Sequence, residues 1–134
     1  MTAALALQSP TALRVELRAN RAVYARGAPV KLTLAITNVG PDPVSLTAPS
    51  SQLYDFTVLK GGAEVWRWSA GHLFAAVLTP LEIPAGQSRE FTESWDQRGH
   101  DGQPVPPGDF LVVGILIGGP QLGLSPQQLR ITIR

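Results

Sequence analysis

Hydrophobic and polar positions alternate along much of this chain. Over 13–18 and 30–37, aliphatic residues occupy every second position, with mostly charged residues or threonine between them. Segments 88–95 and 129–134 show the same alternation. A period of two is typical of half-buried β-strands. After the turn-rich stretch NVGPDP, residues 44–46 predict one more short strand.

Two segments depart from this alternation. FLVVGILI (110–117) is almost continuously apolar, which predicts a strand covered on both faces. It is then either central in a sheet or an edge strand covered by a partner, and central burial is the simpler interpretation. Segment 69–87 is the least regular, and its 73–78 part is compatible with a short strand or a helical turn.

The aromatic stretch SQLYDFTVLKGGAEVWRWS (51–69) predicts a hairpin around two glycines. A two-residue Gly61-Gly62 turn would pair Val58 with Val65. A three-residue loop that includes Ala63 would instead pair Val58 with Trp66, and also Lys60 with Glu64 and Phe56 with Trp68. We expect the three-residue loop, because hairpins of this kind with a left-handed glycine are common.

This register places five large side chains on one face of the hairpin: Tyr54, Phe56, Val58, Trp66 and Trp68. We expect them, together with Trp95, to pack between two sheets, because each large ring buries roughly 150–250 Å². The alternative is an exposed platform on which sugars or peptides stack. On the opposite face, Asp55 lies diagonal to Arg67, which predicts a structural ion pair.

Composition supports an all-β protein. The chain has 134 residues, of which 44% are hydrophobic, so that a single domain over 1–134 can bury a core. With 12 Pro and 13 Gly, long helices are disfavoured and turns are frequent. About eight or nine short strands separated by turns predict an antiparallel β-sandwich.

Charge and cysteine content narrow the partners and the compartment. The net charge is +1 and no basic run occurs, which argues against nucleic acid. The chain has no cysteine, which excludes disulfides and thiolate sites and suits the cytoplasm. The start, MTAALALQSP, is too short for a membrane span, so we expect no membrane insertion. A cell-envelope or secreted location, after removal of a signal peptide, is the alternative.

The sequence contains no recognised catalytic or metal-binding pattern. The histidines are His72 and His100, and no serine lies in a Gly-x-Ser-x-Gly elbow. His72 is interpreted as a loop residue. His100 lies near carboxylates in 93–101, but without a recognised ligand spacing, and we interpret it as part of a solvated loop. We therefore expect no catalytic residue, no metal and no cofactor.

Several motifs together are similar to a known family. They are YDFTV, VWRWS after a glycine turn, PAGQ, a strand that ends in Trp95, and PPGDF. Upstream, YARGAPVKLTLAITNVGPDPVSLT resembles the entry strands of the same family. Over roughly residues 13–117, the chain resembles the intracellular proteinase inhibitor (BsuPI) family. One departure is Phe110, which lacks the hydroxyl of a tyrosine corner.

The resemblance implies an immunoglobulin-like sandwich and, as in the founding member, inhibition of a cytoplasmic subtilisin-type serine protease. We therefore expect a non-enzymatic, protein-binding domain whose partner is a serine protease of the subtilisin class. The alternative is a structural or adhesive immunoglobulin-like module of the bacterial cell envelope, able to bind carbohydrate through exposed tryptophan. The oligomeric state is left open.

Inhibition by a loop requires a rigid, extended segment that presents a side chain to the protease. Three proline-bearing loops are candidates: 38–52, which ranks first, 102–109 and 118–127. Their candidate residues are Pro43, Val44, Leu46, Val105, Leu122 and Leu124. Pairing of an exposed sheet edge with the enzyme, or steric blockage of its cleft, are the other routes, and the sequence does not choose among them.

Overall fold

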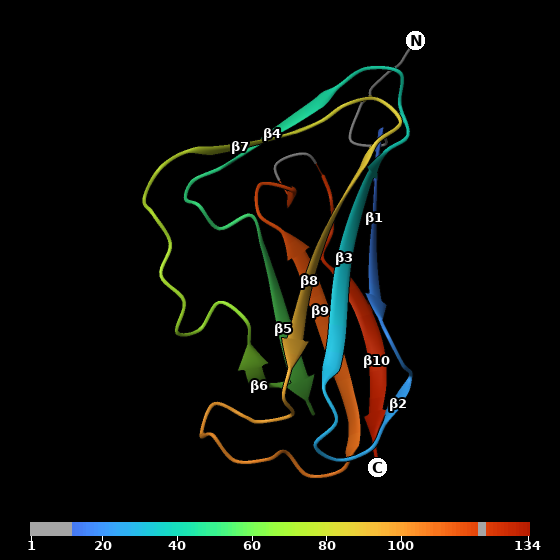
Figure 1. The fold of residues 1–134 in the computed structure, drawn as a ribbon, viewed down its shortest axis with the longest axis vertical. Coiled ribbons are helices and arrows are strands. Elements are labelled where there is room, and N and C mark those ends of the chain that lie inside the picture. Colours follow the sequence, from blue (N-terminus) through green and yellow to red (C-terminus); the bar gives the residue numbers. More distant parts are fainter. Residues whose placement is uncertain (1–11, 121–122) are drawn as a thin grey trace.

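A computed structural model describes residues 12–120 and 123–134, and within these ranges the chain forms ten β-strands and no α-helix (Figure 1). The strands are β1 (Leu13–Ala19), β2 (Val23–Tyr24), β3 (Val30–Asn38), β4 (Val44–Ala48), β5 (Tyr54–Lys60), β6 (Ala63–Arg67), β7 (Thr79–Ile83), β8 (Ser88–Trp95), β9 (Gly108–Leu116) and β10 (Gln127–Ile133).

The strands form two facing sheets and a small third one. One sheet has the order β1-β3-β8, and the facing sheet has the order β2-β10-β9-β5-β6. Strands β4 and β7 pair with each other and lie at the end of the sandwich where β3 stops (Figure 1). The predicted all-β sandwich is confirmed.

Most predicted strands are present in the structure, and two further strands, β2 and β7, were not predicted. Strand β9 is central, between β10 and β5, as the apolar run 110–117 predicted. Its inner residues are buried, whereas the outer ones are only half-buried. The irregular segment 69–87 contains β7, while 73–78 is neither strand nor helix. The short strand β2, which pairs in parallel with the end of β10, was not predicted.

The hairpin of β5 and β6 corrects the predicted turn. Gly61 and Gly62 both have positive φ, 57° and 83°, and form a two-residue turn in which Lys60 faces Ala63. The register then shifts, so that Leu59 faces Glu64 while Val58 faces Trp66. A β-bulge at Val65 therefore restores the aromatic register that a three-residue loop would have produced.

The core lies between the two sheets. Its largest fully buried side chains are Trp95, Tyr24, Phe56 and Phe110. Phe110 packs edge-on against Trp95, with ring centroids 5.8 Å apart, so an apolar ring suits this position. The buried hydroxyl of Tyr24 donates a hydrogen bond to Asn20 Oδ1 at 2.6 Å and so remains satisfied.

Asn38 joins the end of β3 to its neighbours. It is fully buried, and its Nδ2 donates to the carbonyl oxygens of Asp42 (2.7 Å) and Ile83 (2.9 Å). Its Oδ1 accepts a hydrogen bond from Gly40 N at 3.0 Å. One side chain thus connects β3, the turn after it and the end of β7.

Replacement of this amide tests its contribution. Asn38→Ala should lower the free energy of unfolding by about 2–4 kcal/mol, because buried backbone groups lose their partners. Urea unfolding measures the loss. Gln128→Ala, at an exposed position of β10, is the control and should change the free energy by less than about 0.5 kcal/mol. Equal stability of Asn38→Ala and the wild type would contradict the role given to Asn38.

Candidate functional site

The aromatic residues of the hairpin divide into a buried and a half-buried set. Phe56 and Trp95 are fully buried, as predicted for core residues. Tyr54, Trp66 and Trp68 are half-buried and lie where β6 and β8 flank the same side of the sandwich. The aromatic face is therefore neither wholly core nor wholly an exposed platform.

Four rings stack across this side of the sandwich, and we call them the ring stack: Phe91, Tyr54, Trp68 and His72. Tyr54 stacks on Phe91 with centroids 4.5 Å apart and on Trp68 at 4.6 Å. His72 packs against Trp68 with centroids 4.6 Å apart and the ring planes tilted by 31°. The four rings therefore form a continuous row from β8 to the loop that follows β6.

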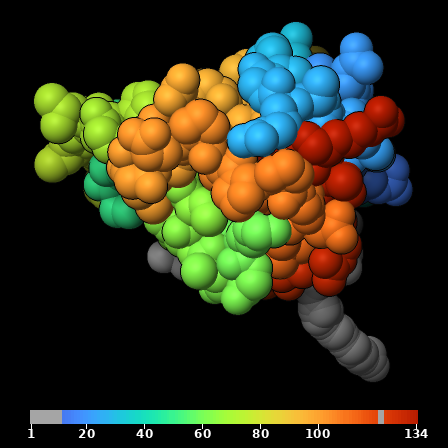
Figure 2. Space-filling view, turned by 90° about the horizontal axis from the view of Figure 1, so that it is seen from below, coloured from blue at the N-terminus to red at the C-terminus, as the bar shows by residue number. Residues whose placement is uncertain are grey.

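The loop 69–78 leaves the sheet at the end of this stack. Three of its large apolar side chains are exposed, and Leu73 is 99% exposed. The neighbours of Leu73 are both held, since His72 stacks on Trp68 and Phe74 contacts the same indole with centroids 5.8 Å apart. The loop, yellow-green in Figure 2, protrudes from the body of the molecule.

Hydrogen bonds fix the loop on both sides of Leu73. Before it, Ala70 N donates to Arg67 O at 3.1 Å and His72 N donates to Ser69 O at 3.0 Å. After it, Ala75 N donates to Ser51 Oγ at 2.8 Å, and Ser51 N donates to Ala75 O at 2.9 Å. The exposed leucine thus lies on a segment held at both ends.

A buried carboxylate supports the start of this loop. Asp55 is 4% exposed and accepts hydrogen bonds from Ser69 N (3.1 Å), Ser69 Oγ (2.5 Å) and Phe56 N (2.9 Å). Arg67 Nη1 lies 3.3 Å from its Oδ2, which confirms the predicted ion pair. Asp55 therefore fixes the turn through which the chain passes from β6 into the loop.

The charged side chains on β6 continue to the neighbouring loop. Glu64 accepts hydrogen bonds from Arg67, and its Oε2 lies 2.7 Å from His100 Nε2. The Arg67 guanidinium, and to a smaller extent His100, lower the pKa of Glu64. His100 N also donates to Val65 O at 2.9 Å, so the loop after β8 covers this part of the β6 edge.

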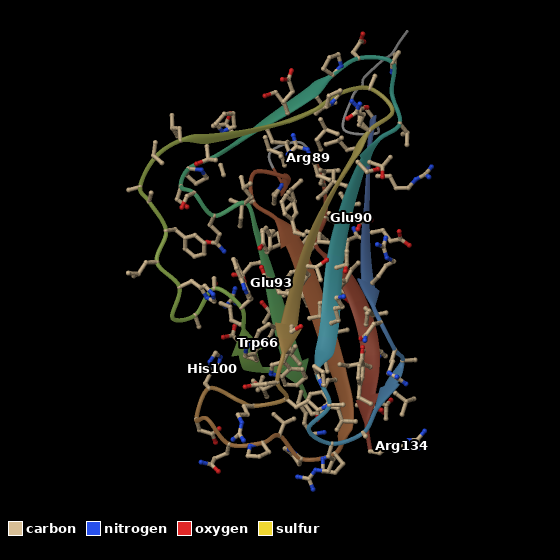
Figure 3. All side chains as sticks on the ribbon, viewed as in Figure 1. Trp66, Arg89, Glu90, Glu93, His100 and Arg134 are labelled. Atoms are coloured by element: carbon tan, nitrogen blue, oxygen red, sulfur yellow. The ribbon has the colours of Figure 1, made fainter. Side chains whose placement is uncertain are left out.

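A groove of about 350 Å³ lies between β6 and the end of β8. Its lining includes Trp66, Trp68, His72, Glu93 and Asp96. Figure 3 shows Glu93 and Trp66 on the same flank of the sandwich, with His100 beyond them. The groove combines aromatic walls with carboxylates.

The proline-bearing loops expose fewer of the predicted inhibitory side chains than the sequence suggested. Leu46 is 4% exposed because the alternation in β4 points it inward, and Val105 is 6% exposed because it packs into the core. Neither side chain is available to enter a protease, which corrects the prediction for these two residues. Val44 and Leu124 are half-buried, Pro43 is exposed, and Leu122 lies outside the described residues.

Leu73 is not among the residues predicted from the sequence. Its segment has no periodic pattern, whereas the predicted inhibitory loops all contain proline. The signal that could have found it is the run HLFAAVL, an apolar stretch without strand alternation directly after the aromatic strand. Apolar residues in an irregular segment indicate either a buried loop or an exposed binding surface, and the structure shows Leu73 exposed.

Over residues 12–120 and 123–134, no three His, Asp or Glu side chains come close enough together to hold a metal ion. Within the same ranges, no helix has the length and apolar character needed to cross a membrane.

Comparison with known protein families establishes to which family this chain belongs. The profile of a family described as intracellular proteinase inhibitor, BsuPI, matches residues 17–120. The chain belongs to the BsuPI family. Membership in an inhibitor family supports a non-enzymatic protein with a protease partner, and the family's description as intracellular agrees with the cytoplasmic location expected from the sequence. No curated protein sequence matches this BsuPI chain.

Solved structures share the fold of the BsuPI domain. A CARDB domain of PF1109 from Pyrococcus furiosus, in complex with di-metal ions, is 12% identical with a TM-score of 0.51, covering 90% of this chain and 91% of that one. The alkylpurine DNA glycosylase AlkC of Pseudomonas fluorescens is 14% identical with a TM-score of 0.55, covering 92% of this chain and 30% of that one. A β-glucosidase from Erythrobacter marinus is 13% identical with a TM-score of 0.55, covering 91% and 15%. This chain thus spans less than a third of either enzyme, and at such identities the likeness shows the immunoglobulin-like fold alone.

The tyrosines provide a test of the packing at the site. Burial raises the pKa of the Tyr54 hydroxyl well above its ordinary value of 10.0, and the hydrogen bond to Glu93 raises it further. Burial also raises the pKa of Tyr24. Because both folded pKa values are raised, the stability from these groups is complete below pH 10 and is lost as the pH rises further.

We therefore expect the native protein to resist tyrosinate formation at pH values where free tyrosine ionises. Ultraviolet absorbance, followed in the native and in the urea-unfolded protein, measures this difference. Tyr54→Phe should leave a single tyrosine with a late titration. A tyrosine of the native wild type that ionises at its ordinary pKa, and whose signal is lost in Tyr54→Phe, would contradict the packing of the ring stack.

Proposed function

We propose that this domain inhibits a subtilisin-type serine protease by presenting the 69–78 loop to the catalytic cleft, with Leu73 entering the specificity pocket. Family membership supports inhibition of a proteinase, and the loop supplies a means. The observation that carries the proposal is the position of Leu73, which is 99% exposed between two neighbours that are both fixed on Trp68.

An apolar side chain that stays exposed in the folded state contributes no hydrophobic stabilisation. Folding therefore gains nothing from Leu73, whereas a hydrophobic specificity pocket binds such a side chain favourably. Full burial of a leucine side chain contributes roughly 1.5–3 kcal/mol, and this amount would add to the free energy of binding when Leu73 enters the pocket. A large exposed residue on a fixed loop thus fits a role in recognition.

Rigidity is what separates an inhibitory loop from a substrate. A loop already held in its bound conformation loses less entropy on binding. The stacking of His72 and the two hydrogen bonds between Ser51 and Ala75 provide that restraint here. If the peptide bond is cut, the same contacts hold both ends in place and favour its reformation.

The adhesive alternative receives less support. A sugar-binding platform needs an open aromatic face, and Trp68 is packed against both Tyr54 and His72. Trp95 is fully buried. Trp66 and Trp68 both border the groove, and both are half-buried.

Substitution of the exposed leucine tests the proposal. Leu73→Asp should weaken inhibition of a susceptible subtilisin-type protease at least 100-fold, roughly 3 kcal/mol, as expected for a central anchor residue. Inhibition is titrated with a chromogenic peptide and with casein in parallel, on a panel that includes proteases of the host. The wild type should reach complete inhibition of both substrates at one-to-one stoichiometry.

Val39→Asp is the matched control, because Val39 is 50% exposed and lies outside the 69–78 loop. It adds the same charge, and we expect inhibition to change less than about threefold. Both sites are exposed, so neither variant should unfold the protein. Full inhibition by Leu73→Asp would show that another surface binds the enzyme, and absence of inhibition by the wild type would remove the proposed function.

A further inference from the structure

Strand β8 is an open edge of its sheet. Asn20 N donates to Lys31 O at 3.1 Å, so the backbone groups of Lys31 point toward the β1 side of β3. Partners alternate along an antiparallel strand, and Lys31 faces Ser94. Ser94, Thr92 and Glu90 therefore direct their N–H and C=O groups away from β3. In the part of the chain that the structure describes, no other strand pairs with β8.

The edge of β6 on the same flank is covered, in contrast. Val65 O accepts a hydrogen bond from His100 N at 2.9 Å, and Arg67 O accepts one from Ala70 N at 3.1 Å. Proteins commonly protect exposed edges in this way. The backbone of β8 thus remains available for pairing, while that of β6 is used by the chain itself.

The groove next to this edge carries negative charge without a basic partner. Glu93 and Asp96 line it beside Trp66. Glu93 Oε2 accepts the hydroxyl hydrogen of Tyr54, and among residues 12–120 and 123–134 no Lys or Arg forms an ion pair with either carboxylate. A half-buried carboxylate without a counter-charge favours the binding of a cation.

We propose that β8 binds an extended segment of a partner protein by strand addition, and that the groove receives an arginine of that segment. In a paired strand, the residue opposite Glu93 projects to the same face of the sheet, over the groove. Its guanidinium would pair with Glu93 and Asp96 and lie on the free part of Trp66. Such binding does not depend on Leu73 entering a protease.

The negative charge of the groove favours an arginine side chain over other side chains. Main-chain hydrogen bonds give affinity to any extended peptide, while side-chain pockets give specificity. An acidic or neutral side chain would leave the two carboxylates uncompensated, whereas arginine can bond in a bidentate manner and stack at the same time. Glu93 and Trp66, labelled in Figure 3, mark where this side chain would lie.

The test uses the intact protein and short synthetic peptides, followed by the amide chemical shifts of isotope-labelled protein. The probe is acetyl-Thr-Val-Arg-Val-Thr-amide. We expect saturable shifts at Thr92 and Ser94 and at the Trp66 indole. A peptide with glutamine in place of arginine should bind at least fivefold more weakly. A peptide methylated on the amides that face β8 should not bind.

Two variants separate the groove from the strand. Glu93→Gln should weaken binding of the arginine peptide at least fivefold and abolish the preference of the protein for the arginine peptide over the glutamine peptide. Glu90→Gln removes the same charge from the same strand, but Glu90 lies on the outer face and pairs with Arg18, so affinity should stay within about twofold.

Three results would overturn the proposal. They are absence of saturable shifts, equal binding of the arginine and glutamine peptides, and undiminished binding of the methylated peptide. Shifts of the β8 amides with protein concentration alone would assign the edge to self-association and would also overturn it. The inhibition assays with Leu73→Asp are independent, so failure of either proposal can be recognised separately.

Discussion

The stacking of Tyr54 on Trp68 connects the interior of the sandwich to the exposed loop 69–78. On this side, β8 and β6 belong to different sheets, and side chains rather than backbone hydrogen bonds close the space between them. Phe91 supports Tyr54 from one sheet, and Trp68 extends the contact outward to His72. The conformation around Leu73 therefore depends on packing that begins in the core.

The same flank carries the two features to which we assign function, and they use different physics. The apolar side chain of Leu73 does not pack into the core and is exposed on a fixed backbone. At β8 it leaves backbone groups and two carboxylates available beside Trp66. A partner that contacts the protruding loop would lie close to the β8 edge, so both could contribute to one interface.

Much of the fold was readable from the sequence because alternation reports burial directly. The period-two pattern located β1, β3, β8 and β10, and the apolar run located the central strand β9. The family and the Asp55–Arg67 ion pair also followed from the residues. The turn at Gly61 did not, because a two-residue turn with a bulge at Val65 and a three-residue loop give the aromatic residues the same register.

The candidate site was less accessible to sequence reasoning. Exposure of a leucine depends on what surrounds it in three dimensions, and Leu73 and Leu46 have the same chemistry but opposite environments. The restraint on the loop comes from Trp68, through ring contacts that no periodic pattern reports, and from Ser51, which is distant in sequence from Ala75. Proline residues in a loop indicate local stiffness but do not reveal restraint by contacts between rings.

The most direct measurement is a hydrogen-exchange footprint of this domain bound to a subtilisin-type protease whose catalytic serine is replaced by alanine. The account predicts protection of the amides of residues 71–77, with little change at 38–43 and at 102–107. Protection confined to the proline-bearing loops, with unchanged exchange around Leu73, would contradict it.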